Sequence, residues 1–308
     1  MKLGVVSRIG EFSQENWRGE FETFGKNGQG ASHLELISNY PYFGPADYTE
    51  EDIGLLKELA RKNELKLTIH LLPNQRGLSK ELSESIFDSQ ERTKEFVEHQ
   101  KKVYSSYNIG ALDGRVRRES RKEILRTLEM ARKLGVEVIT IHGGSYTDDR
   151  EFPINLERAR RTLEEVNPYF TDVKLCVENL PTLGHGNDFI REFPKHIADV
   201  LYLTKDLNNV GICLDVGHAN VSGRVLSFYE ALKKTGKLWD FHLHDNKGDK
   251  DDHLQVGEGN VPFRELFEEL KRDNYQGTLS IELDTWCRRE MQKEERIFAL
   301  DYLRRLMK

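Results

Sequence analysis

Short apolar runs alternate along the chain with longer amphipathic stretches. The runs are rich in β-branched residues and nearly continuous, which is typical of parallel strands buried on both faces. Eight strands are predicted, at Leu3–Val6, His33–Ile37, Lys66–His70, Glu137–His142, Val173–Glu178, Val210–Asp215, Leu238–His244 and Thr278–Leu283. Helices are predicted at Thr49–Asn63, Glu119–Leu134, Asn155–Asn167, Arg191–Lys205, Val225–Lys234, Pro262–Arg272 and Arg289–Met307. This alternation predicts an α/β fold, a single (β/α)8 TIM barrel.

Two segments are longer than the connections that alternating strands and helices need. Trp17–Ala31 is rich in glycine and aromatic residues, and residues 74–118 form a long charged insertion after strand three. Because both follow a strand, both are expected over the mouth, the end of the barrel where the strands finish. We predict that residues 74–118 form a lid, or else a helical side insertion without a role in binding. No linker or repeat divides residues 1–308, so one domain is expected.

The predicted strands end one after another in residues that can bind metal. These residues are His70, His142, Glu178, Asp215, His242, His244 and Glu282. In a barrel the carboxyl ends of the strands face one mouth. Carboxylate oxygens and imidazole nitrogens both bind zinc. Carboxylate oxygens also bind hard divalent cations. Four successive strands therefore predict one ion held by Glu178, Asp215, His242 and Glu282. His244 shares strand parity with His242, and we favour His242 as the ligand.

Further candidate ligands lie in the loops. His218 stands three residues after Asp215, and Asp251 and His253 are separated by one residue. They could form a second locus; the alternative is a solvated charged loop, because Lys247–Asp252 is dense in charge. His70 and His142 could hold another ion together with Glu178. We therefore expect one to three divalent ions, which are zinc, manganese or cobalt.

Composition narrows the class of protein. The chain has 308 residues, 37% of them hydrophobic and 32% charged, with a net charge of −6. No apolar run approaches the roughly 20 residues of a spanning helix, so no membrane partner is expected. The negative charge argues against nucleic acid as a partner. The absence of a secretion signal and three widely spaced cysteines (Cys176, Cys213 and Cys287) predict a cytoplasmic protein with reduced thiols. Homo-oligomer formation stays open.

Several motifs resemble one known family. LCVENLP, ICLDVGHAN, HLHDNKG, DDHLQVGEGN and LSIEL, in this order, look like the xylose isomerase-like TIM-barrel superfamily. That group contains sugar and sugar-phosphate isomerases and epimerases, and endonuclease IV, a metal-dependent nuclease of abasic sites. The resemblance implies that Glu178, Asp215, His242 and Glu282 are the shared metal ligands. It also implies that the extra ligands of the three-zinc nuclease are present, at His70, His142, His218, Asp251 and His253.

Two departures weigh against the nuclease. The family's Tyr-Leu pair that wedges into DNA is replaced here by Pro73-Asn74, and the spacing from His242 to Asp251 is shorter than the family's. The best basic run, Arg115–Lys122, could contact a phosphate backbone, but a solvated helix start is the simpler interpretation.

The resemblance therefore favours an isomerase or epimerase of a small sugar or sugar phosphate. The metal would acidify a substrate C–H bond, and Glu178 and Glu282 would move the proton through an enediolate. His244, Lys247 and Asn179 are the expected substrate contacts. The alternatives are a metal-dependent phosphodiesterase acting on abasic DNA, a lyase or dehydratase on the same barrel, and a barrel that binds a polyol without turnover.

Overall fold

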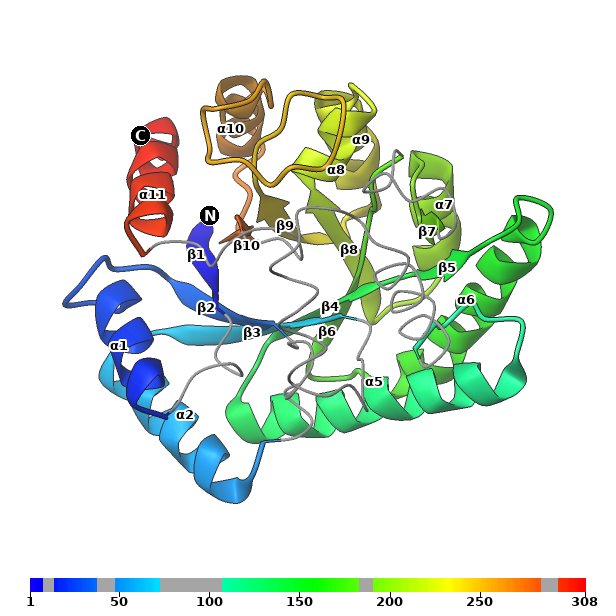
Figure 1. The fold of residues 1–308 in the computed structure, drawn as a ribbon, viewed down its shortest axis with the longest axis horizontal. Coiled ribbons are helices and arrows are strands. Elements are labelled where there is room, and N and C mark those ends of the chain that lie inside the picture. Colours follow the sequence, from blue (N-terminus) through cyan, green and yellow to red (C-terminus); the bar gives the residue numbers. More distant parts are fainter. Residues whose placement is uncertain (8–13, 38–47, 73–106, 183–190, 284–292) are drawn as a thin grey trace, which may run out of the picture.

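Eight parallel strands close into a barrel in a computed structural model, which describes residues 1–7, 14–37, 48–72, 107–182, 191–283 and 293–308. The strand order around the barrel is β1-β10-β9-β8-β6-β4-β3-β2 (Figure 1). The strands are β1 (Lys2–Ser7), β2 (His33–Ile37), β3 (Lys66–Leu71), β4 (Val138–His142), β6 (Lys174–Glu178), β8 (Val210–Asp215), β9 (Leu238–Leu243) and β10 (Thr278–Ile281). Each overlaps a predicted strand, and the predicted TIM barrel is confirmed.

Helices surround the barrel as an outer layer (Figure 1). They are α1 (Gln14–Phe24), α2 (Glu50–Lys62), α5 (Gly114–Leu134), α6 (Phe152–Val166), α7 (Ile197–Thr204), α8 (Val216–Val221), α9 (Val225–Leu232), α10 (Phe263–Arg272) and α11 (Lys293–Met307). Short 3-10 turns at Asn167–Tyr169 and Lys233–Thr235 follow α6 and α9. Helix α11 packs beside β1 and β10, so the last helix of the chain closes the barrel next to its first strand.

The position expected for Trp17–Ala31 is wrong. Trp17, Phe21 and Phe24 are buried on one face of α1, at the spacing of an amphipathic helix that packs on the barrel. The residues that follow α1 lead into the start of β2 and therefore lie at the end opposite the mouth. The aromatic residues are core residues of an ordinary barrel helix, and they do not cover the mouth.

Two other predicted boundaries also change. Arg191–Phe193 forms strand β7, which pairs antiparallel with β5 (Gly144–Tyr146), and a helix begins only at Ile197. Pro194 explains the difference, because proline cannot continue a helix interior. Helix α5 begins at Gly114, where the Asp113 side chain accepts from the backbone N of Arg115 at 2.7 Å. The last five residues of the predicted insertion thus belong to this helix.

The rest of the insertion is described only over residues 107–113. Asn108 is buried there and donates to the carbonyl oxygen of Ser145 on β5 at 2.8 Å, so this end packs against the barrel. The predicted lid at residues 74–106 lies outside the described residues.

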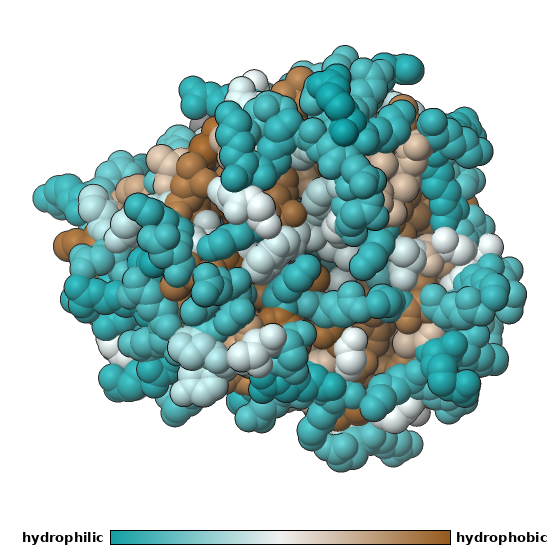
Figure 2. Space-filling model, turned by 180° about the vertical axis from the view of Figure 1, so that it is seen from behind, coloured by the Kyte–Doolittle hydropathy of each residue, from teal (hydrophilic) through white to brown (hydrophobic). Residues whose placement is uncertain are grey.

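The barrel core is mostly apolar, and Cys176 and Cys213 are buried free thiols within it, as predicted. Cys287 lies outside the described residues. Seen from behind, the molecule is largely hydrophilic, with apolar residues in small separate areas (Figure 2). No helix of the described chain has both the length and the apolar character needed to cross a membrane.

Candidate metal centre

The four residues predicted to share one ion meet at the mouth. Glu178 and Asp215 end β6 and β8, His242 lies in β9, and Glu282 directly follows β10. The Nδ1 atom of His242 lies 3.4 Å from Glu178 Oε2 and 2.9 Å from Glu282 Oε2. One ligand atom from each of the four residues lies within 4.8 Å of the others. We call Glu178, Asp215, His242 and Glu282 the central locus.

The chemistry of this locus fits a divalent cation. All four side chains are almost completely buried. Within the described chain, both oxygens of Glu178, Oδ2 of Asp215 and both ring nitrogens of His242 lack a directed hydrogen bond, although they face one another closely. Buried polar atoms without such partners are costly. Lone pairs that converge without hydrogen bonding are expected around a metal ion.

Charge is balanced inside the cluster by the imidazoles. Burial raises the pKa of Glu178 and Glu282, but the attraction of His242 and His70 outweighs it and leaves both pKa values well below the ordinary value. Burial lowers the pKa of His70, but Glu178 and Glu282 raise it overall to about 10. Without metal, the imidazoles therefore act as the counter-charges. A bound divalent cation would replace their protons.

A second group shares Glu178 with the central locus. The Nε2 atom of His70 lies 3.0 Å from Glu178 Oε2, and the Nε2 atom of His142 lies 3.7 Å from the same oxygen. The other ring nitrogen of His142, Nδ1, is hydrogen-bonded to Glu192 Oε1 at 3.0 Å. A ligand histidine typically has its second nitrogen held by a carboxylate or carbonyl in this way.

A third group, the loop locus, comprises His218, Asp251 and His253. The Nε2 atoms of the two histidines lie 3.2 and 3.3 Å from Asp251 Oδ2. Their Nδ1 atoms lie 2.8 and 2.9 Å from the backbone carbonyl oxygens of Asn179 and Glu282. A carbonyl only accepts, so both rings carry a proton at Nδ1. Burial lowers the pKa of both rings, but Asp215 and Asp251 outweigh it at His218 and Asp251 outweighs it at His253, so both pKa values are raised. Without metal, Nε2 of each ring is therefore protonated toward Asp251, and a bound cation would replace these protons.

The loop that carries Asp251 and His253 is tightly held. Asp245 accepts from the backbone N of Gly257 at 2.9 Å and of Val261 at 3.0 Å. Asp251 and His253 are buried, whereas Lys247 is exposed. The alternative of a solvated charged loop is therefore wrong for the two candidate ligands.

Two of the three expected substrate contacts have other partners. The Asn179 side chain donates to the carbonyl oxygen of Asp215 at 3.0 Å and accepts from its backbone N at 2.9 Å. His244 is fully buried, and its Nε2 atom lies 3.0 Å from Asp215 Oδ1. Both side chains contact Asp215, so a role in holding Asp215 stands beside the predicted substrate contact. Lys247, which is exposed, stays a predicted substrate contact.

The sequence reasoning missed two acidic residues. Glu35, in the middle of β2, is fully buried and places Oε1 2.9 Å from Nε2 of His242. Its Oε2 accepts hydrogen bonds from Ser280 at 2.5 Å and Thr68 at 3.1 Å. A glutamate inside an apolar strand was the available signal. Glu192 gave no signal, because its segment was predicted to be helical.

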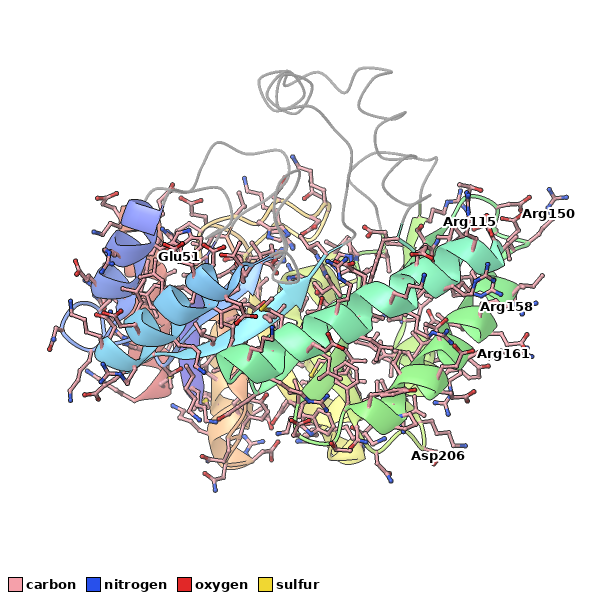
Figure 3. The ribbon with its side chains drawn as sticks, turned by 90° about the horizontal axis from the view of Figure 1, so that it is seen from below. Glu51, Arg115, Arg150, Arg158, Arg161 and Asp206 are labelled. Carbon is pink, nitrogen blue, oxygen red and sulfur yellow. The ribbon has the colours of Figure 1, made fainter. Side chains whose placement is uncertain are left out.

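The basic run Arg115–Lys122 lies at the start of α5, outside the strand barrel. Figure 3 shows Arg115, Arg158 and Arg161 pointing outward from the helical layer. Within the run, Arg121 pairs with Glu165, and Lys122 pairs with Glu119 at 2.8 Å. Two of the five basic side chains of the run are thus matched locally, and the run lies on the outer helical layer, which favours the solvated helix start over a phosphate contact.

A family model described as xylose isomerase-like TIM barrel matches residues 29–306. The chain belongs to this family. This result confirms the resemblance predicted from the strand-end motifs.

The curated relatives align with only part of the chain. An uncharacterised protein of Methanocaldococcus jannaschii is 34% identical over 188 residues, which are 58% of this chain and 61% of the relative. A probable endonuclease 4 of Mycobacterium leprae is 29% identical over 169 residues, which are 52% of this chain and 64% of the relative. The chain thus spans less than two thirds of these relatives' lengths.

Solved structures of the same fold cover the whole chain. A D-tagatose 3-epimerase-like protein has a TM-score of 0.74 and 23% identity, covering 100% of this chain and 97% of that protein. At this identity the likeness shows the fold alone.

Proposed function

We propose that this protein is a metal-dependent isomerase or epimerase of a small sugar or sugar phosphate. The observation that carries the proposal is the pair of buried carboxylates at the mouth. Glu178 and Glu282 come from β6 and from the end of β10, and both approach the Nδ1 atom of His242, at 3.4 and 2.9 Å. Two carboxylates at one centre can take a proton from a substrate carbon and return it.

The surroundings prepare the two glutamates for this role. A divalent ion at the central locus would polarise a substrate carbonyl and lower the pKa of the neighbouring C–H bond. The low pKa values of Glu178 and Glu282 keep both ionised but weakly basic, so proton transfer to either would depend on acidification of the C–H bond by the ion. His70 lies between them, with its ring nitrogens 3.0 Å from Glu178 and 3.3 Å from Glu282. It therefore fixes the relative positions of the two carboxylates.

A second candidate is a metal-dependent phosphodiesterase acting on abasic DNA. In its favour, the two further groups of ligands lie beside the central locus, and a curated relative is a probable endonuclease 4. Against it, the net charge is −6, and two of the five basic side chains of the run on α5 are paired with nearby acidic residues. A nuclease needs a positive surface to neutralise the phosphate backbone.

The two candidates predict opposite results in deuterated water. The protein is loaded with manganese, cobalt or zinc and incubated with a panel of ketoses and their phosphates. An isomerase or epimerase incorporates deuterium at carbon, which mass spectrometry detects. Glu282→Gln should suppress exchange more than substrate binding, because an amide cannot carry the proton. Glu268→Gln, on the exposed outer face of α10, is the matched control.

A nuclease gives the reverse pattern. It incises a duplex that carries one abasic site, binds that duplex less tightly as salt rises, and exchanges no sugar proton. Incision at catalytic enzyme concentration, with no deuterium uptake across the panel, would reject the isomerase proposal.

A further inference from the structure

We propose that His244 is a positioning residue that couples the central locus to the loop locus. A cation in the loop locus would then strengthen cation binding at the central locus, and a cation at the central locus would strengthen binding in the loop locus. The inference rests on the proposed metal centre. It adds a role for a side chain that is a ligand in neither group as we define them.

The first contact of His244 is with the central locus. Its Nε2 atom lies 3.0 Å from Oδ1 of Asp215. The same oxygen accepts from the backbone N of His218 at 2.7 Å. Oδ2 of Asp215 has no directed hydrogen bond within the described chain. The contacts on Oδ1 thus determine which oxygen of Asp215 is left to face an ion.

The second contact is with the loop locus. The rings of His244 and His253 stack with centroids 3.7 Å apart and an interplanar angle of 2°. The lone pair of an imidazole nitrogen lies in the ring plane. Two parallel rings at this separation therefore cannot both hold one ion in their planes. The Nε2 atom of His253 lies 3.3 Å from Asp251 Oδ2, whereas that of His244 lies 3.6 Å from the other oxygen, Oδ1, and closer to Asp215. The geometry therefore assigns the ion of the loop locus to His253 and a supporting position beside it to His244.

Gly217, at the start of α8, confines the ring from another direction. A Cβ atom at this position would lie 2.0–2.4 Å from three atoms of the His244 ring. The imidazole therefore occupies space that any other residue at 217 would fill. Because the ring is held between Gly217 and His253, a shift of His253 displaces the group that holds Asp215. An ion that fixes His253 thus also fixes Asp215, and thermodynamic linkage makes the effect reciprocal.

A double-mutant cycle on metal affinity tests this coupling without an activity assay. Metal-free protein is titrated with zinc against a competing chelator. The zinc-binding step that Asp215→Asn weakens is assigned to the central locus. Asp251→Asn removes a carboxylate from the loop locus and its 3.6 Å contact with Nε2 of His244. It should lower zinc affinity at the central locus by about tenfold, within the usual range of coupling between sites. In a His244→Phe background, which keeps an aromatic ring but removes Nε2, Asp251→Asn should cause a clearly smaller loss, because only the contacts of His218 with Glu178 and Asp215 then join the two loci.

A second variant reaches the same ring with every ligand intact. Gly217→Ala displaces His244 and should lower central-locus affinity as His244→Phe does. Gly54→Ala is the matched control, because a Cβ on this α2 glycine meets no atom within 4 Å. Circular dichroism checks that each variant is folded.

Three results would overturn the coupling: equal losses from Asp251→Asn in both backgrounds, unchanged central affinity in folded Gly217→Ala, or a single zinc per wild-type chain. Failure of deuterium exchange with the coupling intact would count against the isomerase alone.

Discussion

Replacing Asn179 with alanine separates a supporting role from a substrate contact. The side chain is fully buried and makes two hydrogen bonds to the backbone of Asp215, at 2.9 and 3.0 Å. These bonds join the ends of β6 and β8, where Glu178 and Asp215 enter the central locus. In Asn179→Ala both backbone groups of Asp215 lose these partners.

The expected cost follows from those two groups. A buried donor or acceptor left without a partner costs about 1–3 kcal/mol, so the variant should lose about 2–6 kcal/mol of unfolding free energy. This is a large share of the roughly 5–15 kcal/mol that stabilises a typical protein. The midpoint of thermal unfolding should fall by about 5–15 °C. Metal content should fall too, because Asp215 is no longer held in place.

Chemical denaturation, thermal melting and metal analysis measure these effects. Asn208→Ala, at an exposed loop position, is the matched control and should change unfolding free energy by less than about 0.5 kcal/mol. A substrate contact would behave differently, with a raised KM, unchanged stability and full metal content. That outcome for Asn179→Ala would refute the supporting role.

Three further variants test other parts of the structure. Glu192→Ala should weaken metal binding by His142 about 10–100-fold, as measured by chelator competition, because Glu192 holds its Nδ1 atom; unchanged affinity would contradict this. Burial lowers the pKa of His33 from 6.5 to about 4, so the stability of the folded state is intact above pH 6.5 and falls by about 3 kcal/mol as the pH drops to 4. His33→Asn should remove this loss of unfolding free energy at low pH, as measured by urea denaturation between pH 4 and 6.5. The same pH dependence in the variant as in the wild type would contradict the prediction. Lys247→Ala, at an exposed position, should raise KM without changing the melting temperature; an unchanged KM would exclude substrate contact.

The fold could be predicted because each barrel strand is a continuous apolar run. The strand-end residues could be placed for the same reason, since parallel strands bring their carboxyl ends to one mouth. This reasoning located Glu178, Asp215 and His242 on the correct strands, and the structure brings them together with Glu282.

Roles that depend on hydrogen bonds could not be predicted in this way. Asn179 and His244 stand at strand ends like the candidate ligands, and only their contacts show that they support Asp215. Glu192 was missed because β5 and β7 are too short to give a periodic signal. The aromatic residues of α1 were misjudged because glycines at Gly19 and Gly25 hide a helical spacing.

Anomalous X-ray diffraction from crystals of zinc-loaded protein tests the central claim most directly. The claim is that buried acidic and imidazole groups converge on divalent ions at the mouth. It predicts a strong peak at zinc-specific wavelength among Glu178, Asp215, His242 and Glu282, and loss of that peak in Asp215→Asn. Ordered water in place of the peak, with direct carboxylate–imidazole ion pairs retained at saturating zinc, would contradict it.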